Sequence, residues 1–195
     1  MKEEREFNIF GPINPAIHYH VDRIPTKARL REKIAKGRYF TLNASRQTGK
    51  TTIFYEMIAE LEATGEYFGI LLDFEWLANN DQDIFYEELA FMLDEWREMY
   101  APDAPEPTPM RRHNEFVRWL RQTGRQTGKK CILIIDEFES VSPEIITSLL
   151  SLFRGMYVQR YQPNAYAIHS ILLVGVRTIP ALLGGTQSPF NIADQ

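Results

Sequence analysis

Short apolar runs along the chain alternate with longer segments in which apolar residues recur every three or four positions. Four runs have the length and composition of strands, and they cover residues 39–43, 67–74, 131–135 and 170–176. The third, Cys131-Ile132-Leu133-Ile134-Ile135, is apolar throughout, as parallel strands buried on both faces are. The pattern predicts a mostly parallel sheet with helices on both of its faces.

The segments between these runs predict amphipathic helices. Helices are expected over 26–36, 52–64 and 83–100, within 111–130, and from Pro143 after the N-cap Ser142. Within 83–100, the residues expected to face inward are Phe85, Leu89, Met92 and Trp96. Residues 101–109 hold four prolines, which predict an ordered loop.

A phosphate-binding pattern joins the first predicted strand to the second helix. Ala44-Ser45-Arg46-Gln47-Thr48-Gly49-Lys50-Thr51-Thr52 fits G-x-x-x-x-G-K-[S/T], except that Ala44 replaces the first glycine. The order strand, loop, helix is the context in which this motif binds phosphate. The backbone N–H groups of such a loop, at a helix N-terminus, attract anionic oxygens. The motif therefore predicts a P-loop NTPase, a three-layer α/β/α sandwich.

Each position of the loop has an expected role. The phosphate-binding set is Arg46, Gln47, Thr48, Gly49, Lys50, Thr51 and Thr52. The ammonium of Lys50 is expected to contact the β- and γ-phosphates, where it also serves catalysis. The hydroxyl of Thr51 is a hard oxygen ligand suited to Mg²⁺.

Two carboxylates end the third predicted strand, where ligands of open α/β sheets bind. Asp136 is expected to hold Mg²⁺, directly or through water, and Glu137 to orient or deprotonate a water for attack on the γ-phosphate. A surface turn after a core strand is the alternative interpretation of this pair. Arg177 follows the fourth strand, and it is either a sensor of the γ-phosphate or an exposed arginine.

Length and composition limit the class of protein. The chain of 195 residues suits one domain, and its 44% hydrophobic and 25% charged residues are ordinary for a globular protein. No apolar run approaches membrane-spanning length, and the start lacks a secretory apolar segment, so a cytoplasmic location is expected. The net charge of −4 does not indicate nucleic-acid binding. The basic segment 111–130 is either a solvated helix face or a surface for nucleic acid or an acidic partner.

Several motifs together resemble one family. They are Phe10-Gly11-Pro12, Asn14-Pro15, His18-Tyr19, 46–52, 133–137, Gly175-Val176-Arg177 and Ser188-Pro189-Phe190-Asn191-Ile192. This set resembles the bacterial AAA-like ATP-binding proteins, which are related to AAA+ and STAND-type ATPases. The extra strand between the two motifs and the glutamate after Asp136 also resemble the additional-strand, catalytic-glutamate division of P-loop ATPases.

The resemblance implies a division of the chain and a set of ligands. Residues 1–38 would be an N-terminal segment and helix that border the nucleotide, with Tyr19 near the base. Residues 39–195 would form the ATPase core and lack the C-terminal helical lid that such relatives have. ATP and Mg²⁺ are the implied ligands, Arg177 is the implied sensor, and a homo-oligomer or a protein partner is possible.

The sequence thus predicts Mg²⁺-dependent ATP binding and hydrolysis to ADP and phosphate. One alternative is a nucleotide-gated switch or scaffold with little turnover. A second alternative is a kinase of a small molecule or nucleic acid, although Glu137 favours water as the nucleophile. Without a lid, we expect hydrolysis by these residues alone to be slow.

Overall fold

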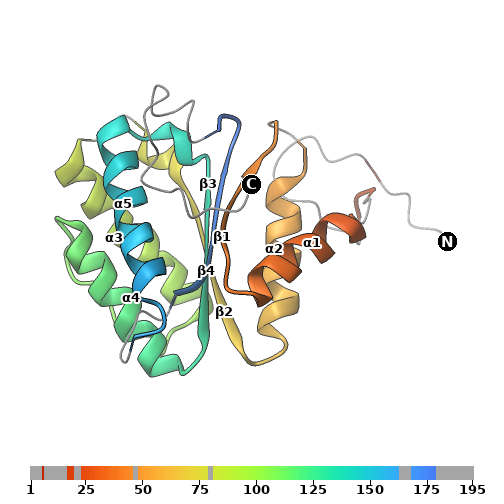
Figure 1. Cartoon of the computed structure of the whole chain (residues 1–195), viewed down its shortest axis with the longest axis horizontal. Helices are drawn as coiled ribbons and strands as arrows, with labels where there is room; N and C mark the ends of the chain where they lie inside the picture. The colour runs from red at the N-terminus through yellow and green to blue at the C-terminus, as the bar shows by residue number, and fades with distance from the viewer. Residues whose placement is uncertain are drawn as a thin grey trace.

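Four parallel strands form the centre of the molecule (Figure 1). The computed structural model describes residues 6, 17–19, 23–45, 48–78, 81–162 and 168–178. The strands are β1 (Tyr39–Asn43), β2 (Tyr67–Asp73), β3 (Lys130–Asp136) and β4 (Ile168–Gly175). Their order is β1-β4-β3-β2, and every pair is parallel. The predicted parallel sheet is confirmed.

Helices cover both faces of the sheet and complete the three-layer α/β/α arrangement (Figure 1). Helices α1 (Ile24–Ala35) and α2 (Lys50–Glu62) lie on one face. Helices α3 (Gln82–Tyr100), α4 (His113–Thr127) and α5 (Pro143–Gln159) lie on the other. Successive residues of a strand point to opposite faces. The sheet therefore separates two apolar cores, with Leu133 in the larger and Ile134 in the smaller.

The start of α2 differs from the predicted start in a way that matters for the loop. The helix was expected from residue 52, but it begins at Lys50. Gly49 is its N-cap and has a left-handed backbone, with φ of 74°. Glycine adopts this conformation without the steric cost that a Cβ brings. Lys50 and Thr51 therefore lie in the first turn of α2, where the backbone N–H groups have no partner within the helix.

Two local predictions about loops and caps are confirmed. The Ser142 side chain caps α5 by accepting a hydrogen bond from the Ile145 N–H at 3.4 Å. The proline-rich residues 101–109 contain no helix or strand. Trp119 of α4 donates its indole N–H to the Pro105 carbonyl at 2.8 Å, which fastens this loop to the larger core.

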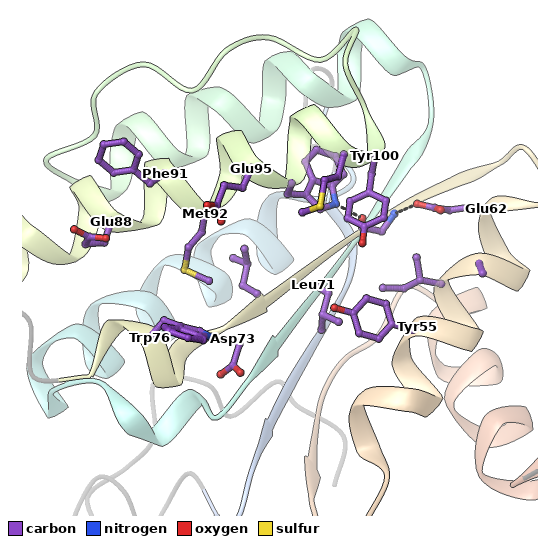
Figure 2. Close-up of a pocket in the computed structure, with 16 residues that line it drawn as sticks. Tyr55, Glu62, Leu71, Asp73, Trp76, Glu88, Phe91, Met92, Glu95 and Tyr100 are labelled. Carbon is purple, nitrogen blue, oxygen red and sulfur yellow. Dashed lines mark hydrogen bonds between the residues drawn. The ribbon is translucent and has the colours of Figure 1, made fainter. Parts of the chain in front are cut away.

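One of the residues expected to face inward is only partly buried. The side chains that α3 buries include Phe85, Leu89, Leu93 and Trp96, whereas Met92 is half-buried. Met92 packs against the larger core and also lines a groove beside β2 (Figure 2). Because β2 is the edge strand among the described strands, this groove lies at the side of the sheet.

Two further features of the fold concern Cys131 and the length of the helices. Cys131 is fully buried in β3, and this burial raises the pKa of its thiol, as an inert core cysteine requires. Among the described residues, no helix is both long and apolar enough to cross a membrane.

Candidate functional site

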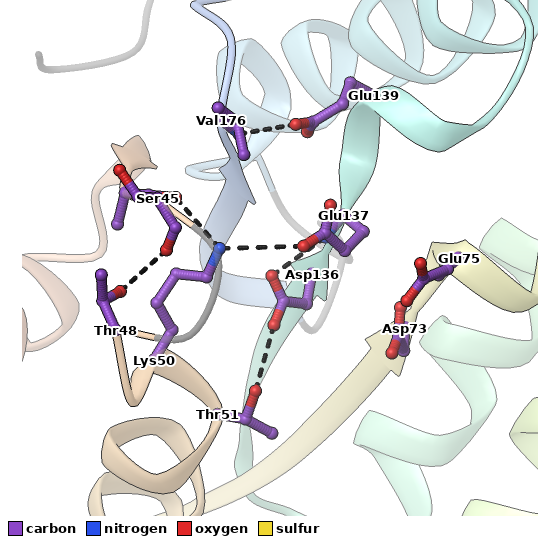
Figure 3. Close-up of polar contacts among 11 residues, drawn as sticks. Ser45, Thr48, Lys50, Thr51, Asp73, Glu75, Asp136, Glu137, Glu139 and Val176 are labelled. Atoms are coloured by element: carbon purple, nitrogen blue, oxygen red, sulfur yellow. Dashed lines mark hydrogen bonds and ion pairs between the residues drawn. The ribbon is translucent and has the colours of Figure 1, made fainter. Parts of the chain in front are cut away.

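The two sequence motifs meet at the carboxyl edge of the sheet (Figure 3). The phosphate-binding loop follows β1, and Asp136 ends β3. Strand β4 lies between these two strands, so the motifs are separated by the width of one strand. Open α/β sheets bind ligands outside the carboxyl ends of their strands. The described residues of the two motifs are therefore gathered at one edge.

The backbone at position 44 is compatible with alanine in place of the first glycine of the motif. The Ala44 N–H donates to the Gly175 carbonyl at 3.1 Å, so residue 44 continues the pairing between β1 and β4. Among the described non-glycine residues, only Glu137 has a positive φ, so Ala44 has an ordinary backbone. A methyl group is tolerated there because no left-handed conformation is needed. At Gly49 the conformation, and not lack of space, requires glycine.

Lys50 is a buried cation that contacts both motifs. Its side chain is 8% exposed, and its Nζ donates to the Ala44 carbonyl at 3.1 Å. The same Nζ lies 3.8 Å from Oε1 of Glu137 (Figure 3). A buried charge is costly unless it is paired or hydrogen-bonded. The ammonium of Lys50 is therefore held beside the loop by one hydrogen bond and one ion pair.

Thr51 and Asp136 bring two hard oxygen donors together. The Thr51 hydroxyl donates to Oδ2 of Asp136 at 3.4 Å, and the Glu137 N–H donates to Oδ1 of Asp136 at 3.0 Å. Mg²⁺ prefers such oxygens and keeps several waters and phosphate oxygens as its other ligands. In the part of the chain that is described, no group of three or more His, Cys, Asp or Glu side chains could hold a metal ion. The donor set fits a metal ion shared with a phosphate group.

Glu137 has the unusual backbone of the site. Its φ of 48° and ψ of 42° are left-handed, a conformation that costs a non-glycine residue about 1–3 kcal/mol. This turn directs the carboxylate toward Lys50 (Figure 3). Strain at a buried carboxylate is a recurrent feature of functional sites.

The other predicted site residues are distributed as follows. Thr48 closes the loop, since its hydroxyl donates to the Ser45 carbonyl at 2.9 Å, and Thr52 is buried in α2. Arg46 and Gln47 lie outside the described residues. Arg177 is exposed just beyond β4. Tyr19 is also exposed, and its backbone N–H donates to the Glu6 carbonyl at 3.0 Å.

The end of the basic segment 111–130 lies away from this site. Its last members, Arg125, Lys129 and Lys130, line a cleft of about 490 Å³ together with Lys36 and Arg160. Lys130 begins β3, so the cleft lies at the amino end of that strand, opposite Asp136. Nucleic-acid binding by this segment stays a hypothesis.

Glu139 is a structural partner of the site that the sequence did not identify. Its Oε1 accepts a hydrogen bond from the Val176 N–H at 2.6 Å (Figure 3). Among the residues that the structure describes, none forms a hydrogen bond with its buried Oε2. A Cβ at Gly175 would lie 1.9 Å from this Oε2. The glycine before Val176 is the signal in the sequence that could have indicated close packing here, but it does not indicate the partner.

We expect Gly175→Ala to destabilise the fold by about 1 kcal/mol, since the added methyl displaces the Glu139 carboxylate from Val176 and a partly exposed hydrogen bond is lost. Urea unfolding measures the change. In a Glu139→Ala background the same substitution should cost much less, because the clash and the bond are both gone. Equal costs in the two backgrounds would contradict this coupling.

Comparison with solved structures supports the fold. A chain from the structure of Drosophila ORC bound to DNA is 13% identical, with a TM-score of 0.56 over 84% of this chain and 27% of that one. A chain of Drosophila ORC bound to poly(dA/dT) DNA and Cdc6 is 15% identical, with a TM-score of 0.55 over 84% of this chain and 26% of that one. Cdc6p from Pyrobaculum aerophilum is 19% identical, with a TM-score of 0.51 over 89% of this chain and 45% of that one. The chain thus spans from about a quarter to under half of these structures.

No curated protein shows a significant match to the chain. A model of one protein family, described as Predicted AAA-ATPase, matches residues 37–181. The match includes the loop, Lys50, Asp136, Glu137 and Arg177, and it covers well over half of the sequence. The chain therefore belongs to the Predicted AAA-ATPase family.

Proposed function

We propose that this domain binds ATP with Mg²⁺ and hydrolyses it to ADP and phosphate. The observation that carries the proposal is the pair of contacts across the carboxyl edge of the sheet. Lys50 faces Glu137 at 3.8 Å, and Thr51 faces Asp136 at 3.4 Å. Each contact joins a residue of the phosphate-binding loop to a carboxylate that is suited to binding a metal ion or orienting a water. The family membership supports the same activity.

Phosphate binding rests on the loop and the first turn of α2. The free backbone N–H groups there and the positive end of the helix dipole favour anionic oxygens. The ammonium of Lys50 can exchange its contact with Glu137 for oxygens of the β- and γ-phosphates. Thr51 and Asp136 would hold Mg²⁺, which when bound neutralises charge that develops on the phosphates.

Hydrolysis requires a group that orients water, and Glu137 is the best-placed candidate. Once Lys50 binds phosphate, the Glu137 carboxylate can accept a proton from a water aligned with the γ-phosphate. Arg177 follows β4, which lies between the strands of the two motifs. From there its guanidinium would sense or stabilise the γ-phosphate. Tyr19 and the segment around it would contact the base.

The direct test combines calorimetric titration of the protein with ATP and a multiple-turnover assay of phosphate release, each with Mg²⁺ or with EDTA. We expect ATP binding, Mg²⁺-dependent release of phosphate, and no need for an acceptor substrate. Binding without turnover would favour a nucleotide-gated switch. Formation of ADP that requires an added acceptor, with phosphate transferred to that acceptor and not released, would favour a kinase. Absence of ATP binding by the folded protein would refute the proposal.

Asp136→Asn and Thr51→Val should each weaken the Mg²⁺ dependence of ATP binding. Each substitution removes an oxygen ligand or its charge. Such changes at metal sites commonly lower the affinity for the metal on the order of tenfold or more. The measurement is the Mg²⁺ concentration that gives half-maximal enhancement of ATP affinity. Thr64→Val is the matched control, because Thr64 lies just beyond the other end of α2 and its hydroxyl bonds to near neighbours, donating to the Leu61 carbonyl and accepting from the Glu66 N–H. An effect of Thr64→Val equal to that of Thr51→Val would contradict the assignment.

A further inference from the structure

A large groove runs along the free edge of β2, between α2 and α3 (Figure 2). Its volume is about 720 Å³. Several large apolar side chains that line it face solvent: Trp76 is 81% exposed, Phe91 68% and Met99 67%. Contiguous exposed apolar surface on a small domain marks an interaction site more often than isolated apolar residues do.

The charge of the groove has one sign. Four carboxylates line it, Glu62, Asp73, Glu88 and Glu95, and none of the lining residues is Lys, Arg or His. Within the described residues, Glu88 and Glu95 are exposed and make no ion pair. A partner that fits must therefore offer cationic groups beside apolar ones.

The middle of the β2 edge is closed to an added strand. The Gly69 N–H donates to Oε1 of Glu62 at 2.8 Å, and the Gly69 carbonyl accepts from Nε1 of Trp96 at 2.8 Å (Figure 2). Both outward backbone groups of this residue are thus bonded to side chains. Strand addition needs a continuous row of free N–H and C=O groups. An extended peptide is therefore a poor occupant.

The spacing along α3 suits a helix instead. Glu88, Met92, Glu95 and Met99 recur every three or four residues and form a stripe on the groove side of α3. This stripe lies beside the buried stripe that includes Leu89 and Trp96, and Trp96 also lines the groove. At 1.5 Å per residue, residues 88–99 span roughly 16 Å, which is about three helical turns.

We propose that this groove binds an amphipathic helix of a partner protein, with apolar side chains at i, i+3 or i+4, and i+7. These side chains would pack against Trp76, Phe91 and Met99. Lysine or arginine residues at the flanks of that helix would pair with Glu88 and Glu95. This mode of recognition uses an apolar groove for affinity and rim charges for orientation and rate. It does not depend on ATP hydrolysis.

The test uses a fluorescein-labelled, three-turn helical peptide with leucines at these spacings and lysines on both flanks, and a second peptide with glutamates in place of the lysines. Fluorescence anisotropy measures the affinity of each. We expect the lysine peptide to bind more tightly. Phe91→Ala and Glu95→Lys should each weaken its binding by about tenfold or more, as loss of an anchor or reversal of a paired charge does.

Matched variants distinguish binding of the peptide in this groove from nonspecific binding elsewhere on the protein. Glu87→Lys makes the same charge change on an exposed neighbour that does not line the groove, and Tyr161→Ala removes an exposed aromatic ring elsewhere. Both should change affinity by less than about twofold, within the range usual for contacts outside a hot spot. Equal binding of the two peptides, or equal effects of Glu87→Lys and Glu95→Lys, would overturn the proposal. So would a concentration-dependent dimer that Phe91→Ala dissociates, because a second copy would then fill the groove.

Discussion

Replacing Lys50 with alanine is expected to abolish detectable binding of Mg-ATP. Lys50 supplies a buried ammonium in the first turn of α2, held 3.1 Å from the Ala44 carbonyl and 3.8 Å from Glu137. A charge-assisted hydrogen bond contributes about 1.5–3 kcal/mol, and more where water is excluded. The upper value corresponds to on the order of a hundredfold in affinity. Calorimetric titration of the folded variant measures this loss.

The control for this substitution is Lys36→Ala. Lys36 is an exposed lysine just after α1, paired with Glu32 at 2.6 Å, and it lines the basic cleft with Lys130, which begins β3. Its loss should leave ATP affinity unchanged. Circular dichroism of Lys50→Ala checks folding, since the change leaves the buried Glu137 without this cation. Undiminished affinity in a folded Lys50→Ala protein would show that phosphate binds elsewhere.

Glu137→Gln should retain ATP binding and lose most hydrolysis. Glutamine keeps the size of the side chain and its contact with Lys50, but it cannot accept a proton from water. Removal of a general base typically costs on the order of 10²–10⁴ in rate. Multiple-turnover phosphate release at saturating ATP measures the effect, with titration of the same sample to show that ATP is bound.

Glu144→Gln provides the comparison, because Glu144 is an exposed carboxylate in the first turn of α5. It should hydrolyse ATP at the wild-type rate. If Glu137→Gln did the same, the left-handed backbone and the contact with Lys50 would be structural features only. Another group would then have to activate the water.

Local sequence was sufficient for most of the elements. The four strands fall within about two residues of their predicted bounds. A short, continuous apolar run between two helices is compatible with few structures other than a buried strand. The start of α2 was missed because its first turn belongs to the loop motif and has no apolar periodicity. Gly49 marks that start through its backbone conformation.

Contacts between distant residues depended on the tertiary structure. Thr51 and Asp136 are 85 positions apart, and the sequence predicted only that each would end near the same edge of the sheet. Their hydrogen bond follows from the order β1-β4-β3-β2, which places β4 between the two motifs. The packing of Glu139 against Gly175 follows from the same order.

The sequence by itself therefore determined the fold class, and it identified the residues of the loop and of the β3 end as candidates. It could do so because strand formation, the backbone freedom of glycine and the charge of a side chain are properties of local sequence. Only the tertiary structure decided the left-handed turn at Glu137, the basic cleft and the acidic groove beside β2. These features arise where separate elements meet. Met92 illustrates the reason: its spacing marks it as apolar and helical, but β2 is an edge strand, and that position leaves its side chain in a groove.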